Sequence, residues 1–217
     1  MKQYKRAEDN VIFPWLQKHL QPKTTIVDIG ARKGNWYREI AQFFPDSDAH
    51  LFEPTPNIVE HITRKFKKNT QHVHAVALSN EQGTLGFHID LELGGWSGLT
   101  QQRKNGKYRT IQVEVKTLDS FKFKNVGLIK IDVEGNELKT IQGAKKTIKK
   151  YKPIVYFECA DVHMRNYNYG SGEIFDFFNN IDMQILDLDL KICTRDQIQK
   201  HTKSKSSFYH NFIAIPK

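Results

Sequence analysis

The sequence predicts an α/β domain, doubly wound around a mostly parallel β-sheet with helices on both faces. Three observations lead to this prediction. Short runs rich in β-branched residues alternate with helical patterns along the chain. Glycine turns join strands to helices, and polar residues follow several strands at their carboxyl ends. The 217 residues, 39% of them hydrophobic, suffice for one such domain with a sizeable core.

The first strand and the turn after it form the central motif. The β-branched run Thr25–Ile29 is typical of a buried parallel strand, and it breaks at Gly30. The chain turns through Gly34 and enters a helical pattern, Asn35–Phe44, which Pro45 ends. A strand, a glycine turn and a helix N-terminus together point backbone N–H groups at a bound ligand.

The spacing of this turn argues against a dinucleotide. The motif is Asp28-x-Gly30-x-x-x-Gly34, and Arg32 stands where G-x-G-x-x-G requires its second glycine. That glycine lets the backbone approach a pyrophosphate, and a side chain at the position opposes this approach. A nucleoside ligand without a pyrophosphate therefore fits better than NAD.

Periodicities of two and of about 3.6 residues predict the other elements. Residues 1–22 form a helical cap whose amphipathic pattern runs over Val11–Leu20. The last two predicted strands suit a hairpin, which would place an antiparallel strand at one edge of the sheet. The predicted strands after the first are Ala49–Phe52, His72–Leu78, Val126–Val133, Ile154–Cys159, Met183–Leu188 and His210–Ile215, and the predicted helices are Pro56–Lys67, Glu137–Lys150 and Gly172–Phe178, with a helical turn at Leu118–Phe121.

An irregular segment interrupts the alternation. Residues 85–116 contain two runs that alternate like strands, Leu85–Ile89 and Thr110–Val115, with the glycine-containing loop Leu93–Thr100 between them. We expect an inserted hairpin whose loop reaches over a ligand. The chain contains no repeat, low-complexity tract or linker, so we expect a single domain over residues 1–217.

Composition favours a cytoplasmic protein. No apolar run reaches the roughly 18–20 residues that span a bilayer. The basic N-terminus lacks the apolar segment of a secretory signal. Cys159 and Cys193 lie far apart in sequence, and we expect two free thiols in a reducing compartment.

The net charge of +9 favours an anionic partner, such as nucleic acid, a sugar nucleotide or an anionic glycan. The lysines are spread along the chain, however, and two of their groups fall on predicted helices as solvated faces. Aromatic side chains do not interleave with the lysines as a groove for single-stranded nucleic acid requires. Nucleic acid is therefore disfavoured as a partner.

Acidic residues gather at the carboxyl ends of the predicted strands, where open parallel sheets bind ligands. Glu53 follows the second strand, and a carboxylate there can accept hydrogen bonds from both ribose hydroxyls of a nucleoside. Asp132, at a later strand end, can hold a cofactor ammonium or take a proton from a substrate hydroxyl. Lys130 lies inside an apolar strand and requires a partner, for which Glu158 is the candidate.

A metal site has weaker support. Asp132, Glu134 and Glu158 offer oxygen ligands that suit Mg²⁺. His72 and His74 share one face of a strand, but no further His or Cys cluster completes a zinc site. We therefore predict no bound metal.

Several stretches of the chain resemble one known family, the FkbM-type methyltransferases. These are class I, S-adenosylmethionine-dependent O-methyltransferases, and the resemblance implies their Rossmann-like, seven-stranded sheet with an antiparallel last strand. It covers about Thr25–Cys159 and is most specific in its last stretch. The stretches are Ile26–Gly34, Leu51–Pro54, Ala75–Asn80, Thr117–Phe121 and Ile129–Glu137.

The resemblance also implies which residues bind the cofactor. Glu53 would take the ribose, and Ala77–Ser79 would border the adenine. Asp132 and Glu134 would face the transferred methyl group. The sequence departs from the family at Arg32-Lys33, where the family usually carries Asn and an apolar residue. The expected cofactor-binding residues are Asp28, Gly30, Ala31, Gly34, Asn35, Trp36, Glu53, Pro54, Ala77, Leu78, Ser79 and Asp132.

Methyl transfer to a hydroxyl is an in-line displacement at a sulfonium methyl, for which the protein supplies orientation and a base. A hydroxyl is a weak nucleophile, so a base within hydrogen-bond reach should matter. We expect Asp132 or Glu134 in this role, with His163 as the rival base. The residues expected to contact the acceptor are Trp96, Ser97 and Glu158.

The predicted function is O-methylation of a sugar, glycan or natural-product hydroxyl, with S-adenosylmethionine as cofactor and S-adenosylhomocysteine as its product. Two alternatives remain open. One is an RNA methyltransferase, suggested by the positive charge, and the other is a non-catalytic nucleoside-binding module with a vestigial pocket. An NAD-dependent oxidoreductase is disfavoured by Arg32. No motif identifies the acceptor or the oligomeric state.

Overall fold

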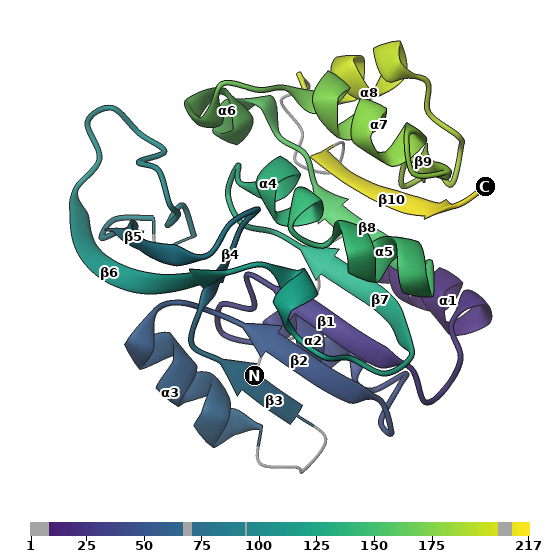
Figure 1. Cartoon of the computed structure of the whole chain (residues 1–217), viewed down its shortest axis with the longest axis horizontal. Helices are drawn as coiled ribbons and strands as arrows, with labels where there is room; N and C mark the ends of the chain where they lie inside the picture. Colours follow the sequence, from purple (N-terminus) through teal and green to yellow (C-terminus); the bar gives the residue numbers. More distant parts are fainter. Residues whose placement is uncertain (1–8, 67–70, 94, 204–209) are drawn as a thin grey trace.

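The structure is a computed structural model that describes residues 9–66, 71–93, 95–203 and 210–217. A seven-stranded sheet runs through the molecule in the order β3-β2-β1-β7-β8-β10-β9 (Figure 1). In this order, each strand from β3 through β2, β1 and β7 to β8 is parallel to its neighbours, and β10 is antiparallel to both β8 and β9. The strands of this sheet are β1 (Thr25–Ile29), β2 (Asp48–Phe52), β3 (Gln71–His74), β7 (Val126–Ile131), β8 (Ile154–Glu158), β9 (Met183–Leu186) and β10 (Asn211–Pro216).

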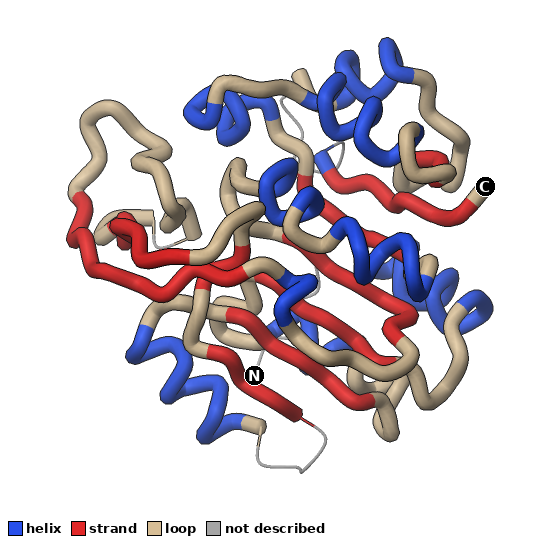
Figure 2. Tube along the Cα trace, in the orientation of Figure 1, coloured by secondary structure: helices blue, strands red, loops and turns tan. Residues whose placement is uncertain are grey.

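Helices cover both faces of this sheet (Figure 2). One face packs against α1, α2 and α3, and the other against α4, α5, α7 and α8. The helices are α1 (Asp9–His19), α2 (Asn35–Ile40), α3 (Pro56–Lys65), α4 (Glu137–Gln142), α5 (Lys145–Tyr151), α6 (Asp161–Met164), α7 (Ser171–Asn179) and α8 (Arg195–His201), with 3₁₀ turns at η1 (Leu118–Ser120) and η2 (Arg165–Tyr167).

The central strand β1 is buried on both of its faces. All of its residues are buried, because helices lie over both faces. Ile26 packs into the core with α1 and α2, whereas Val27 and Ile29 pack into the core with α4 and α5. Alternation along the strand therefore supplies both hydrophobic cores at once.

A second, three-stranded sheet lies beside the main one, in the order β4-β6-β5. It consists of β4 (Ala77–Leu78), β5 (Gly83–Asp90) and β6 (Tyr108–Lys116). β5 and β6 form an antiparallel hairpin, as expected from the alternating runs in residues 85–116. The buried carboxylate of Asp90 fixes the connecting loop, because it accepts hydrogen bonds at 2.9 Å from both Nε and Nη2 of Arg103.

The predicted fold class is confirmed, and two predicted elements are each corrected to a pair. The strand predicted over His72–Leu78 is two strands, β3 and β4, that belong to different sheets. The helix predicted over Glu137–Lys150 is two helices, α4 and α5, because the side chain of Asp119 caps the N-terminus of α5. Its carboxylate oxygens accept the backbone N–H groups of Lys146 at 2.9 Å and Thr147 at 2.8 Å.

The C-terminal region differs more from the prediction. β9 and β10 pair antiparallel as expected, but β10 lies between β8 and β9 instead of at the edge of the sheet. The segment predicted as a polar loop contains α8, which begins with a capping box. Thr194 Oγ1 accepts the Gln197 N–H at 3.3 Å, and Gln197 Oε1 accepts the Thr194 N–H at 2.8 Å. Over the described ranges, no helix has the length and apolar character to cross a bilayer.

Candidate active site

A cavity of about 570 Å³ opens at the carboxyl ends of β1, β2 and β7. Its volume falls within the range of small-molecule sites, roughly 300–1,000 Å³. The walls come from the loops after these three strands, from β4 and from the β5–β6 hairpin. The main sheet and the second sheet meet at this place (Figure 1).

The loop after β1 depends on its glycines. Gly30 has a φ of 76°, and a Cβ atom there would overlap the carbonyl oxygen of Asp132. Its N–H donates to the Phe52 carbonyl at 3.1 Å, which ties the loop to the end of β2. Gly34 has a φ of 65°, and a Cβ atom would overlap the ring of Phe66. Both positions therefore favour glycine, and at Gly30 the neighbour that a side chain would meet is backbone.

Glu53 is held rigidly in the cavity wall. Its Oε2 accepts the Arg32 N–H at 3.0 Å, and its Oε1 accepts the Thr55 N–H at 2.9 Å. Burial raises the pKa of Glu53, and these hydrogen bonds oppose the rise. Each carboxylate oxygen retains a second lone pair, so the oriented group can accept further hydrogen bonds from a ligand.

A buried lysine organises the floor of the cavity. Lys130 Nζ lies 3.2 Å from Asp28 Oδ1 and 3.4 Å from Asp132 Oδ2, and it donates to the Gly30 carbonyl at 3.2 Å. The ion pairs of Lys130 are therefore made with Asp28 and Asp132, which corrects the expected pairing with Glu158. Asp28 lies beneath the cavity instead of in its wall, and it acts on the site through Lys130.

The loop after β7 is fixed by a residue whose role the sequence did not reveal. Glu137 Oε1 accepts the backbone N–H groups of Val133 at 3.0 Å and Gly135 at 3.2 Å. Complete burial raises the pKa of Glu137 to about 7. Tyr169 adds a second clamp, since its hydroxyl donates to the Gly135 carbonyl and accepts the Leu138 N–H.

The same loop is tied to β4. Asn136 Nδ2 and Thr140 Oγ1 both donate to the Leu78 carbonyl, each at 3.0 Å. Ala77 and Leu78 consequently line the cavity beside Asn136, whereas Ser79 does not. This contact joins the main sheet to the second sheet at the site.

Glu134 and His163 form a hydrogen-bonded pair. Glu134 Oε2 lies 3.2 Å from His163 Nε2, and His163 Nδ1 lies 3.3 Å from Gln102 Oε1. Because Gln102 Oε1 accepts, Nδ1 carries the imidazole proton and Nε2 faces Glu134 without one. Burial holds the pKa of Glu134 well above its usual range, and the nearby charges of Glu158 and Asp132 add to this effect. Burial lowers the pKa of His163 to about 4. Both shifts oppose the charged form of each group, so they favour a hydrogen bond in which the Glu134 carboxyl donates to His163 Nε2.

The structure brings most of the expected site residues together. Gly34 instead precedes α2 as its N-cap residue, and Trp96 packs its ring against His163 with centroids 4.8 Å apart. Glu158 and His163 lie behind Glu134, and one ligand-type atom of each lies within 4.8 Å of the others. The expected residues that line the cavity are Gly30, Ala31, Asn35, Trp36, Glu53, Pro54, Ala77, Leu78, Ser97, Asp132 and Glu134, and those that do not are Asp28, Gly34, Ser79, Trp96, Glu158 and His163.

The sequence did not reveal the wall that the inserted hairpin supplies. Phe87, Ile89 and Arg109 of β5 and β6 line the cavity, with Leu99 from the loop between these strands. The alternation of the two strands was visible, but nothing in it indicated which face meets the cavity. That face is set by the pairing of β6 with β4.

The sheet order, the antiparallel last strand and the acid-lined cavity at the carboxyl ends of β1 and β2 define a class I, Rossmann-like methyltransferase. Residues 28–191 match the model of the methyltransferase FkbM domain. The chain belongs to the FkbM methyltransferase family, whose cofactor is S-adenosylmethionine, and the predicted family is confirmed.

Known proteins agree with this assignment. The chain is 29% identical over 159 residues to the 2-O-methyltransferase NoeI of Sinorhizobium fredii (strain NBRC 101917 / NGR234), with 65% of each sequence covered. It therefore spans just under two thirds of the length of this curated relative.

Two solved structures share the fold. The methyltransferase FkbM from Methylobacillus flagellatus KT matches with a TM-score of 0.59 and 16% identity, over 97% of this chain and 48% of that one. A putative rRNA methylase from Clostridium thermocellum matches with a TM-score of 0.54 and 10% identity, over 97% and 94% of the two chains. At these identities the matches support the fold alone.

Proposed function

We propose that this chain is an S-adenosylmethionine-dependent O-methyltransferase that acts on a sugar hydroxyl. The observation that carries the proposal is the placement of Glu53. It is buried at the end of β2 with both oxygens anchored to backbone N–H groups, yet it faces a cavity of nucleoside size. A carboxylate held in this way suits the two hydroxyls of a ribose.

The cavity also contains unmatched polar atoms that suit the cofactor. The indole Nε1 of Trp36 and the Oδ1 of Asn136 are buried, and neither has a hydrogen-bond partner within the part of the chain that the structure describes. Both residues line the cavity. Buried polar groups are almost always paired, so an unmatched donor and acceptor here favour a polar ligand. S-adenosylmethionine offers a carboxylate to the donor and an adenine amine to the acceptor.

When bound, S-adenosylmethionine supplies an electrophilic methyl group on a sulfonium. The chain's own residues must then remove the proton of the acceptor hydroxyl. We assign this task to the Glu134–His163 pair, because Glu134 lines the cavity and His163 lies directly behind it. Glu134 takes the hydroxyl proton on its free oxygen while its own proton passes to His163 Nε2. Transfer of that proton would leave a positive charge on the His163 ring.

Two features support transfer to an oxygen of an anionic acceptor, and a sugar derivative fits both. The relative NoeI is a 2-O-methyltransferase by name. The cavity is also lined by the exposed cationic residues Arg32, Lys33 and Arg109, which favour an acceptor that carries negative charge. A sugar nucleotide or an acidic glycan combines such charge with free hydroxyls.

The test uses S-adenosylmethionine labelled in its methyl group. The purified chain is incubated with a panel of sugar nucleotides, acidic glycans and neutral glycosides, and with ribosomal RNA as the rival acceptor. We expect label in a saccharide, and an alkali-stable O-methyl product. Glu134→Gln and His163→Ala should each lower kcat by about 10²–10⁴-fold if the pair is the base. Transfer to RNA alone, or no transfer by a chain that binds the cofactor, would refute the sugar assignment.

A further inference from the structure

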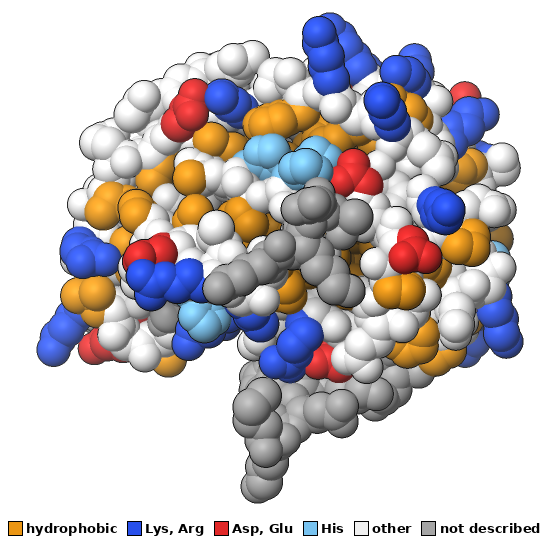
Figure 3. Space-filling view, turned by 90° about the horizontal axis from the view of Figure 1, so that it is seen from below, with side chains coloured by type: hydrophobic (Ala, Val, Ile, Leu, Met, Phe, Trp, Pro, Cys, Tyr) orange, Lys and Arg blue, Asp and Glu red, His pale blue; other side chains and the backbone are white. Residues whose placement is uncertain are grey.

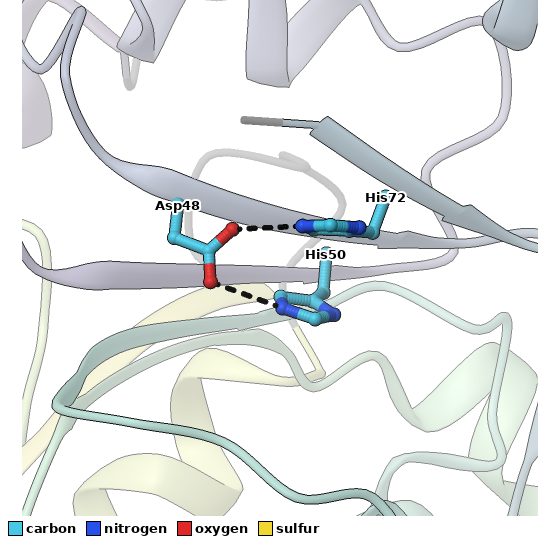
Figure 4. A group of neighbouring side chains, drawn as sticks. All are labelled: Asp48, His50 and His72. Carbon is cyan, nitrogen blue, oxygen red and sulfur yellow. Dashed lines mark hydrogen bonds and ion pairs between the residues drawn. The ribbon is translucent and has the colours of Figure 1, made fainter. Parts of the chain in front are cut away.

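Two neighbouring strands bring a carboxylate and two imidazoles together at the far end of β2 from the cavity. Asp48 and His50 lie on one face of β2, and His72 lies opposite His50 on β3. The two rings stack with centroids 4.7 Å apart, and the Asp48 carboxylate lies beside them with one oxygen facing each ring (Figure 4). Its Oδ1 is 3.1 Å from His72 Nε2, and its Oδ2 is 3.4 Å from His50 Nε2.

We propose that Asp48, His50 and His72 bind a divalent transition-metal ion of the zinc type. A tetrahedral zinc site with bonds of about 2.0–2.1 Å places its ligand atoms about 3.3 Å apart. The two measured separations, 3.1 and 3.4 Å, bracket this value. One ligand atom from each of the three residues lies within 4.8 Å of the others. Two imidazoles and one carboxylate favour zinc-type ions, whereas Mg²⁺ and Ca²⁺ prefer oxygen ligands alone.

A fourth residue completes the surroundings of such an ion. Histidines that bind metals generally donate their other ring N–H to a fixed acceptor. His50 Nδ1 faces His74 Nε2 at 2.9 Å, so a single proton lies between the two nitrogens. With that proton on His50 Nδ1, the lone pair of His50 Nε2 points at the proposed ion. His74 is itself held by stacking on Phe52, with ring centroids 4.5 Å apart.

The site is open to solvent on one side. The side chains of Asp48 and His72 are 47% and 48% exposed, whereas that of His50 is 14% exposed. Histidine side chains lie beside an acidic one on this surface of the molecule (Figure 3). An ion can therefore enter from solvent and keep a water molecule as its fourth ligand. Because its ligands come from β2 and the edge strand β3, the ion would clamp the two strands together.

The experiment uses the full chain without a polyhistidine tag, stripped of metal with a chelator. Zn²⁺ is titrated by calorimetry, and Co²⁺ is titrated by visible absorption. We expect one Zn²⁺ per chain, a tetrahedral Co²⁺ spectrum, a higher melting temperature with Zn²⁺, and no response to Mg²⁺. His72→Ala and Asp48→Asn should each weaken Zn²⁺ binding more than about 10-fold, and His74→Phe by about 10–100-fold.

Three further variants locate the ion. His61→Ala removes an exposed histidine of α3 and should leave binding unchanged. His163→Ala and Cys193→Ala test the two other groups of potential ligands in the described chain, Glu134 with Glu158 and His163, and Asp187 with Cys193 and His201. Both variants should retain Zn²⁺ binding. Binding that is absent in the wild type, or that survives both His72→Ala and Asp48→Asn, would overturn the proposal and leave an ordinary Asp–His hydrogen-bonded cluster.

Discussion

The backbone N–H of Arg32 donates to Oε2 of Glu53 at 3.0 Å, and this bond joins the glycine loop after β1 to the end of β2. Arg32 has a φ of 49°, in the left-handed region that non-glycine residues seldom occupy. Its side chain reaches Gly95, where an added Cβ would lie 3.1 Å from Nη1. The backbone of Arg32 therefore serves the cavity wall, while its guanidinium lies at the rim.

Gly30→Ala should destabilise the protein, because the new Cβ would overlap the Asp132 carbonyl at a positive φ. We expect the free energy of unfolding to fall by at least about 1–3 kcal/mol. Gly83→Ala is the matched control, since an added Cβ there meets nothing within 4 Å. It should change the free energy by less than about 0.5 kcal/mol. Equal urea midpoints for the two variants would contradict the account of the loop.

Glu137→Ala should lower the free energy of unfolding by about 1–3 kcal/mol or more, because it leaves two buried backbone N–H groups without their acceptor. Glu137→Gln keeps an acceptor oxygen and should remain close to the wild type. The comparison is made by urea unfolding at fixed pH. Equal losses in both variants would show that the carboxylate itself is required.

The raised pKa of Glu137 should also make stability depend on pH. Burial moves it from 4.5 to about 7 in the folded chain. As pH rises through this interval, the unfolded chain releases the proton first, so folding loses stability. Between pH 4.5 and 7, the free energy of unfolding of the wild type should decline relative to that of Glu137→Gln. Above pH 7 the difference between the two free energies should stay constant. Parallel curves would refute this assignment.

Lys130→Met should be strongly destabilising, by about 3–5 kcal/mol, because it leaves the Asp28 carboxylate buried beside Asp132 without its cation. The double variant Asp28→Asn/Lys130→Met should recover part of this loss, and urea unfolding of the single and double variants measures it. A double variant no more stable than Lys130→Met would indicate that Lys130 acts mainly through Asp132.

The rate of methyl transfer should fall on the acid side only at a pH well below 6.5, the ordinary pKa of histidine. Burial lowers the pKa of His163 to about 4, and protonation of its ring removes the site that receives the proton. Activity should therefore be flat near neutrality and fall only as pH approaches that value. NMR titration of the His163 ring provides an independent check. An acid limb at pH 6–7 that disappears in His163→Gln would contradict the predicted burial effect.

The sequence predicted the main sheet well because local patterns determine it. The run Thr25–Ile29 is rich in β-branched residues, and the glycines after it suit positive φ, so both features are visible without a structure. The break between α4 and α5 was missed because it depends on Asp119, which lies more than twenty residues upstream of the N–H groups it caps. Such long-range capping leaves no periodic signal.

The site was predicted in outline and corrected in its pairings. Strand ends located Glu53, Asp132 and Glu134, because parallel strands bring their carboxyl ends to one edge. The partner of Lys130 required the register between β1 and β7, which places Lys130 opposite Asp28. No sequence pattern reports a register between strands about a hundred residues apart.

The most direct test of the central claim is calorimetric titration of the chain with S-adenosylhomocysteine. We expect one site per chain, with binding weakened about 10–100-fold in Glu53→Ala through loss of hydrogen bonds to a charged group. Glu60→Ala, at an exposed position of α3, should bind like the wild type. Absence of binding in the wild type, or equal affinity in Glu53→Ala, would contradict the placement of the cofactor in this cavity.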